Sequence, residues 1–136
     1  MTSKEVVKAW FKNIDDQNYD ALKSLMASDH KFHNPMSPAP LGVEEHIGMA
    51  QMMTNSLQGK HHVEILVEEN GWIAVYGRWK GKHVGEFQGV PATGNDVEFT
   101  WTDFFQIVDG KISEEYLEMN PLSLMTQIGA AEAQGS

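Results

Sequence analysis

The sequence predicts an α+β domain: a cone-shaped barrel in which a curved antiparallel or mixed sheet wraps around N-terminal helices. Two observations predict it. Apolar residues recur at helical spacing through the chain up to Leu57, and from Lys60 onward they alternate with a period of two. A sheet that wraps around helices leaves a pocket at the open end of the cone. We therefore expect one core and one cavity.

Three helices are predicted in the N-terminal half. The first covers residues 3–14, with Thr2 or Ser3 as N-cap, and a shorter one begins at Tyr19. The third covers residues 42–57 and ends before Gly59. The prolines between residues 35 and 40 exclude a continuous helix between the second and the third.

The C-terminal half is predicted to be mostly strand. Residues 63–67 and 72–79 form a hairpin, and residues 83–87 form a shorter strand. A long strand over residues 97–107 turns at Asp109-Gly110 into a last strand over residues 111–119.

Asn120 and Pro121 begin a short closing helix as its N-cap and first helical residue. We expect one domain over residues 1–129 and a flexible C-terminal tail over residues 130–136.

Composition excludes several classes of function. The chain of 136 residues carries 19 acidic against 10 basic residues, a formal net charge of −9, so a nucleic-acid partner or an anionic membrane surface is not expected. There is no apolar run long enough for a membrane span and no secretory signal pattern, so a cytoplasmic location is expected. The absence of cysteine excludes thiol chemistry. Histidines, carboxylates, tyrosines and bound water remain.

Asp103 is the most informative residue of the chain. It interrupts an otherwise apolar row on the long strand, so its carboxyl group must find a partner, take up a proton or face a wet cavity. A structural role, with the carboxylate held by backbone or hydroxyl donors, is the alternative. The apolar row consists of Val97, Phe99, Trp101, Phe105 and Ile107.

The partner of Asp103 depends on how the last hairpin turns. A two-residue turn pairs Ile107 with Ile112, whereas a three-residue loop with a bulge places Asp103 opposite Glu115 and matches apolar residues with apolar ones. The second register is therefore favoured. Two carboxyl groups in an apolar cavity cannot both ionise cheaply, so one holds a proton and serves as general acid or base. In the alternative, Glu115 lies at the sheet margin and reaches solvent.

Other side chains are candidates for the pocket wall. His33 follows the helical region and is expected to line the cavity, or else to be half-exposed and bonded to backbone. Tyr76 and Arg78 share one face of a strand and could hold a carbonyl or carboxylate group, although Arg78 could equally pair with a surface acid. The histidines show no zinc-binding spacing, so neither a metal nor another cofactor is expected.

Several loop and turn motifs resemble those of SnoaL-like polyketide cyclases of the NTF2-like superfamily. They are the loop over residues 81–94, the segment over residues 104–114 around Asp109-Gly110, the His33-Asn34-Pro35 step and the end of the closing helix over residues 122–129. The resemblance covers nearly the whole chain. It implies the cone-shaped α+β barrel and a homodimer.

The resemblance also implies a histidine on the long strand and an acid/base aspartate on the last strand. These fall on Asp103 and Leu117, and both positions depart from the pattern. Leu117 cannot transfer a proton.

The hypothesis is therefore an enzyme of cyclase or isomerase type that acts on a small uncharged hydrophobic molecule. Asp103 is the acid/base, Glu115 tunes it and His33 polarises a carbonyl group. A non-catalytic binding or dimerising module with the same pocket is the alternative. The expected substrate-binding residues are Trp10, Met53, Tyr76, Arg78, Trp101 and Leu117.

Overall fold

The structure is a computed structural model that describes residues 1–130. Apart from Ala130, the predicted flexible tail lies outside the described residues. The elements, in chain order, are α1 (Ser3–Asp15), α2 (Tyr19–Ser24), β1 (Met26–His33), α3 (Val43–Ser56), β2 (Leu57–Glu69), β3 (Trp72–His83), β4 (Asp96–Val108), β5 (Lys111–Met119) and α4 (Pro121–Gln127).

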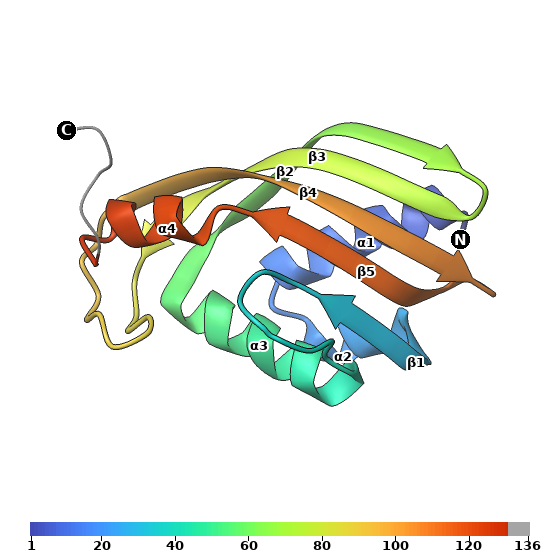
Figure 1. Cartoon of the computed structure of the whole chain (residues 1–136), viewed down its shortest axis with the longest axis horizontal. Helices are drawn as coiled ribbons and strands as arrows, with labels where there is room; N and C mark the ends of the chain where they lie inside the picture. Colours follow the sequence, from blue (N-terminus) through green and yellow to red (C-terminus); the bar gives the residue numbers. More distant parts are fainter. Residues whose placement is uncertain (131–136) are drawn as a thin grey trace.

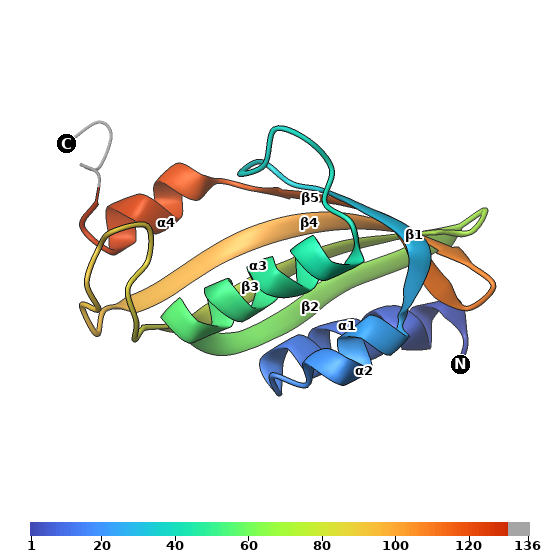
Figure 2. The same ribbon diagram turned by 90° about the horizontal axis from the view of Figure 1, so that it is seen from below.

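A single five-stranded sheet of order β1-β5-β4-β3-β2 forms the body of the molecule (Figure 1). β1 runs parallel to β5, and the other neighbours are antiparallel. Seen from below, α1, α2 and α3 lie against one side of the curved strands (Figure 2). The predicted α+β class, with a mixed sheet around N-terminal helices, is confirmed.

The helix termini follow the capping chemistry of the sequence. The Thr2 hydroxyl accepts from the backbone N–H of Glu5 while the Glu5 carboxylate accepts from the N–H of Thr2, a capping box that begins α1. The Asn120 side chain accepts from the N–H of Leu122 at 3.0 Å and begins α4 as predicted. Among the described residues, none of the helices has both the length and the apolar character that a membrane crossing requires.

The predicted strand over residues 83–87 is wrong. β3 continues without a break to His83, and the N–H groups of Val84 and Gly85 then donate to the carbonyl of Ser56 instead of joining the sheet. Positive φ angles at Gln88 and Gly89 turn the chain back. The segment is therefore a loop tied to the end of α3.

The predicted three-residue loop of the last hairpin is also wrong. Asp109 and Gly110 both have positive φ, as a two-residue type I′ turn requires, and Ile107 pairs with Ile112. The register then shifts, so that Gln106 pairs with Glu114 and Asp103 lies opposite Leu117. This bulge brings Glu115 to the face that carries Asp103, diagonal to it rather than directly across.

Candidate functional site

A cavity of about 400 Å³ lies between the helices and the sheet. α1 and α3 contribute one side, and β2, β3, β4 and β5 contribute the other. Its wall is mostly aromatic and aliphatic, with a few polar groups at specific points, as ligand-binding cavities commonly are. The lining side chains include Trp10, Asp15, His46, Met53, His61, Trp101, Asp103, Glu115 and Leu117.

Asp103 lies in the wall of this cavity and is 2% exposed. The indole N–H of Trp101 donates to Asp103 Oδ2 at 3.1 Å, and the Asp103 carboxyl group also hydrogen-bonds to the carboxyl group of Glu115. Gly77 on β3 makes room for this arrangement, because a Cβ there would lie 2.4 Å from the Trp101 ring. Backbone donors do not hold the carboxyl group, so its protonation state depends on the neighbouring side chains.

Glu115 is the second buried carboxyl group, at 3% exposure. Burial raises the pKa of Glu115 to about 7. Burial and the neighbouring charge of Glu115 raise the pKa of Asp103 well above its usual range. The pair therefore holds at least one proton near neutral pH and titrates as a unit.

Two buried histidines form a chain behind Glu115. His30 Nδ1 lies 2.9 Å from the carbonyl oxygen of Ile112, and His30 Nε2 lies 2.9 Å from His46 Nδ1. His46 Nε2 lies 4.0 Å from Glu115 Oε1, and the His46 ring stacks on Phe32 with centroids 3.7 Å apart. Burial lowers the pKa of both histidines, that of His46 well below its usual value, so both are neutral.

A separate acid–histidine pair contributes to another part of the cavity wall. Asp15, the last residue of α1, accepts from His61 Nδ1 at 2.6 Å and from the His61 backbone N–H at 3.0 Å. The His61 ring meets Trp101 edge-on, with centroids 5.0 Å apart. This contact ties β2 to α1 and fixes which way the imidazole points.

His30, His46 and Glu115 also offer one potential metal ligand atom each within 4.8 Å of one another. The two facing histidine nitrogens already hydrogen-bond to each other. The arrangement is therefore satisfied as a chain of hydrogen bonds, and a metal ion would have to break the central one.

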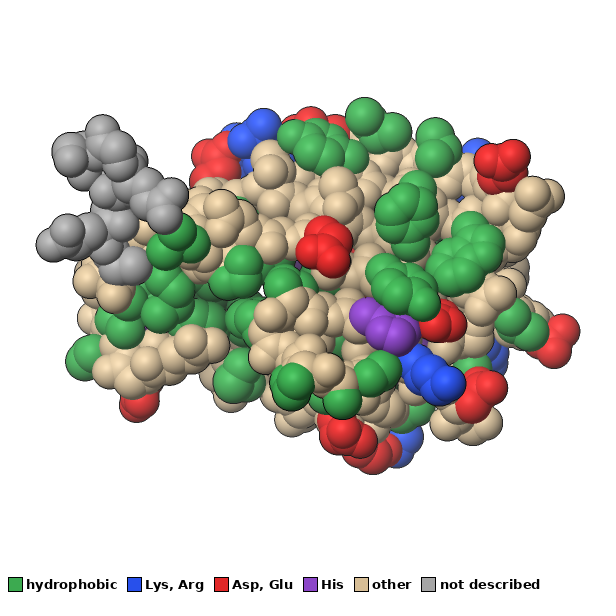
Figure 3. Space-filling model, viewed as in Figure 1, with side chains coloured by type: hydrophobic (Ala, Val, Ile, Leu, Met, Phe, Trp, Pro, Cys, Tyr) green, Lys and Arg blue, Asp and Glu red, His purple; other side chains and the backbone are tan. Residues whose placement is uncertain are grey.

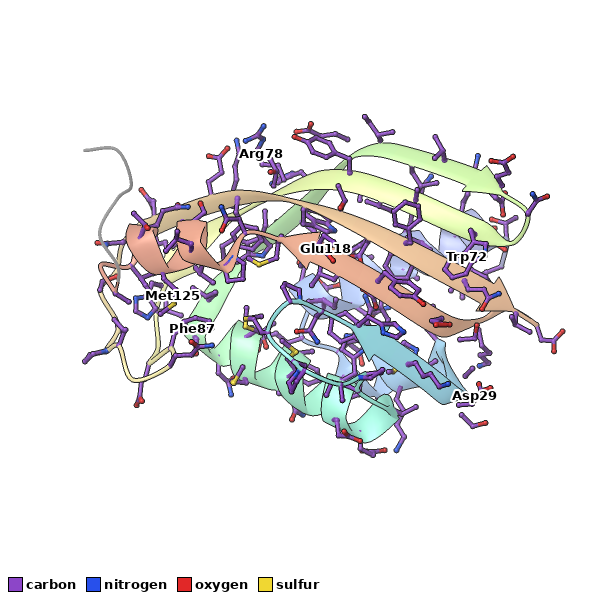
Figure 4. The ribbon with its side chains drawn as sticks, viewed as in Figure 1. Asp29, Trp72, Arg78, Phe87, Glu118 and Met125 are labelled. Atoms are coloured by element: carbon purple, nitrogen blue, oxygen red, sulfur yellow. The ribbon has the colours of Figure 1, made fainter. Side chains whose placement is uncertain are left out.

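The structure brings six of the nine predicted site residues to the cavity: Trp10, Met53, Trp101, Asp103, Glu115 and Leu117. Tyr76 and Arg78 are not among them. They share a face of β3, as predicted, but it is the outer one, and Arg78 projects away from the helices (Figure 4). The Arg78 guanidinium donates to Glu98 Oε1 at 2.9 Å and to Glu64 Oε1 at 3.4 Å. Arg78 therefore pairs with surface acids, which was the alternative expected for it.

His33 also lies outside the cavity, contrary to the prediction. Its ring stacks on Tyr116 with centroids 4.1 Å apart, and Nε2 is 3.2 Å from Glu114 Oε1. β1 alternates faces, so His30 and Phe32 point inward and His33 points outward. The buried histidine of this strand is His30.

No site role was predicted from the sequence for His30, His46, His61 or Asp15. His46 was recognisable as a histidine on the apolar side of its helix, which favours burial. Its partners lie 16 residues away in His30 and on β5, and the Asp15–His61 contact spans 46 residues. No local pattern reports contacts at such separations.

Comparison with known proteins gives the family. A model of the family described as SnoaL-like polyketide cyclase matches residues 4–128. The chain belongs to this family. Aklanonic acid methyl ester cyclase DnrD of Streptomyces peucetius is 37% identical to it over 70 residues, 51% of this chain and 48% of DnrD. Aklanonic acid methyl ester cyclase DauD of Streptomyces sp. (strain C5) is 30% identical over 106 residues, 74% of this chain and 66% of DauD.

The matched part of this SnoaL-like chain thus spans about half of DnrD and just under two thirds of DauD. Among solved structures, IdmH from Streptomyces antibioticus superposes with a TM-score of 0.84 at 22% identity, covering 95% of this chain and 99% of IdmH. At that identity the likeness establishes the fold. The chemistry must be argued from the cavity.

Proposed function

We propose that this SnoaL-like protein is an enzyme of cyclase or isomerase type that moves protons on a small, uncharged, hydrophobic polycyclic molecule bound in the cavity. One observation carries the proposal: two buried carboxyl groups, Asp103 and Glu115, share the wall of a mostly apolar cavity and both have raised pKa values. DnrD and DauD are both named aklanonic acid methyl ester cyclase, which agrees with this class of reaction.

The carboxyl pair suits acid–base chemistry on carbon. A pair that holds one proton near neutral pH can accept a proton at one oxygen and donate one from another. In an intramolecular cyclisation, the ionised carboxylate of the pair removes a proton from carbon next to a carbonyl group. The resulting enolate forms the carbon–carbon bond, and the carboxyl pair returns a proton to the new alkoxide. The protein is regenerated, and substrate and product have the same atoms.

The acid in this chain comes from β4. Leu117 occupies the position on β5 where the resemblance implies an aspartate, and Asp103 is its direct partner across the strand pair. The acid of this chain thus lies on β4, directly opposite the β5 position at which the resemblance implies it. Glu115 is the tuning partner, since its charge and the burial of the pair hold a proton on Asp103. The carbonyl-polarising role predicted for His33 is not retained, because His33 lies on the outer face.

A non-catalytic binding module is the second candidate. The same cavity could hold a ligand without turnover, with Asp103 serving only as a hydrogen-bond donor. The two candidates differ in one respect: proton transfer needs an ionisable group at residue 103, whereas binding needs only a donor.

The test is the Asp103→Asn variant, which keeps shape and hydrogen bonding but cannot transfer a proton. We expect the wild-type protein to convert aklanonic acid methyl ester, or to exchange solvent deuterium into it, and we expect the variant to bind the ester without either activity. Asp109→Asn, in the exposed turn of the same hairpin, is the matched control and should keep full activity. Retained turnover in Asp103→Asn would contradict the assignment, and a wild-type protein that binds the ester without turnover would favour the binding module.

The homodimer and the cytoplasmic location remain predictions. Sedimentation velocity at micromolar concentration tests the first, and fractionation of cells that express the protein tests the second.

A further inference from the structure

The carbonyl of Ile112 fixes the protonation pattern of the two buried histidines. A carbonyl oxygen only accepts, so His30 Nδ1, at 2.9 Å from it, must carry the hydrogen. In a neutral ring the other nitrogen is then an acceptor. His30 Nε2 therefore accepts from His46 Nδ1 at 2.9 Å, which leaves His46 Nε2 with a free lone pair.

This lone pair belongs to the cavity. His46 lines it, and the stacking of its ring on Phe32 holds the imidazole plane in place. Glu115 Oε1 lies 4.0 Å from His46 Nε2, which is too far for a hydrogen bond, so Glu115 does not satisfy this lone pair.

The carboxyl pair does not offer a further free atom. The Asp103 and Glu115 carboxyl groups hydrogen-bond to each other, and Asp103 Oδ2 also accepts from the Trp101 indole. Buried polar atoms are rarely left unpaired, so the free lone pair of His46 Nε2 marks the place of a missing donor.

We propose that His46 Nε2, beside the carboxyl pair, forms a subsite for a hydroxyl group of the ligand, a phenol, enol or alcohol, and that His30 is a positioning residue that keeps His46 an acceptor. The subsite rests on the proposed function for its place in a reaction. A hydroxyl can donate to His46 Nε2. A carbonyl group has no hydrogen to donate to it, and a carboxylate would meet the carboxyl pair with like charge.

The first experiment observes the histidines directly. Long-range ¹H–¹⁵N correlation spectra of the ¹⁵N-labelled protein at neutral pH should show His30 and His46 both neutral and protonated on Nδ1. The His30→Phe variant removes the acceptor of His46 Nδ1, so His46 should shift toward the Nε2–H form. A His46 ring protonated on Nε2 in the wild-type protein, or a metal ion bound stoichiometrically to these histidines, would overturn the proposal.

The second experiment measures the hydroxyl preference by binding alone, with 2-naphthol and its methyl ether as probes. We expect wild-type protein to prefer the naphthol by about tenfold, the size of one buried hydrogen bond. His46→Phe should abolish the preference, His46→Gln, which restores an acceptor, should recover part of it, and the exposed-site control His62→Ala should retain it in full.

An undiminished preference in a folded His46→Phe variant would overturn the subsite, and so would equal binding of the two probes by the wild-type protein. Neither measurement involves turnover. Activity in Asp103→Asn would overturn the proposed function while the histidine spectra and the role of His46 in the naphthol preference stood.

Discussion

Glu114 and Glu115 are neighbours on β5 with the same side chain and opposite environments. Glu114 points to the outer face, where hydrogen bonds from Tyr116 and His33 lower its pKa. Glu115 points to the cavity, where burial raises its pKa to about 7. One step along a strand exchanges the faces of a sheet, and here it exchanges a solvated anion for a group that holds a proton near neutral pH.

The same contrast extends over both faces of the sheet. The outer face carries exposed ion pairs of Arg78 and Lys82 together with exposed apolar side chains, and Figure 3 shows hydrophobic and charged groups interspersed on the visible surface. The inner face has few polar groups, and some of their atoms are unpaired. Charge on the outer face is screened by solvent and contributes little to stability. A charge in the cavity carries a large desolvation cost, and the groups that bear it are available for chemistry.

The largest expected effect comes from reversing the charge on each face. Glu115→Lys places an ammonium group in an apolar wall and should destabilise the fold by about 3 kcal/mol or more, enough to leave much of the protein unfolded. Glu114→Lys should change the free energy of unfolding by no more than about 1 kcal/mol. Urea denaturation of both variants measures the difference, and similar losses would break the contrast between the faces.

The pH dependence of stability is the next largest effect. The pKa of Glu115 is 4.5 for the unfolded reference and about 7 in the folded state, so the folded protein binds more protons between these values. The contribution of Glu115 is present in full below the lower value and is lost as pH rises through the upper one. For a shift of this size it amounts to about 3 kcal/mol, and the raised pKa of Asp103 adds in the same direction.

Urea denaturation at about pH 5 and about pH 8 measures this fall. The Glu115→Gln variant should show a smaller fall than the wild-type protein, because one titrating group is gone and the charge that raises the pKa of Asp103 is gone with it. Glu114→Gln is the matched control and should fall as the wild type does. Stability that rises from the lower to the higher pH would mean that both carboxyl groups ionise without penalty.

The sequence predicted the parts of the molecule that depend on local chemistry. The caps at Thr2 and Asn120 follow from short-range hydrogen bonds and φ preferences. Asp103 stood out because a carboxyl group in an apolar row needs an explanation wherever the strand lies. These inferences need no knowledge of the partner strand.

The remaining site depended on choices that a period of two leaves open. Alternation put Tyr76 and Arg78 on one face but could not say which, because Trp79 and Val75 make the other face equally eligible. The bulge lies between the turn and Glu114, and matching apolar with apolar residues across a three-residue loop gave a register two residues off at Asp103. His30 and His46 meet through tertiary packing, which no spacing in the sequence encodes.

The smallest expected effects are on the outer face. Arg78→Ala removes exposed pairs with Glu64 and Glu98, and it should change the free energy of unfolding by about 0.5 kcal/mol or less and leave turnover unchanged. His33→Ala should likewise keep turnover. Steady-state kinetics alongside urea denaturation checks both, and a tenfold loss of turnover in either folded variant would return that residue to the candidate site.

The shared proton of Asp103 and Glu115 is the central claim, and infrared difference spectroscopy tests it most directly. At neutral pH the wild-type protein should show the C=O stretch of a protonated carboxyl group, sensitive to exchange into D₂O. The band should persist in Glu114→Gln and disappear in the double variant Asp103→Asn, Glu115→Gln. A wild-type spectrum at neutral pH with carboxylate bands alone would contradict the account.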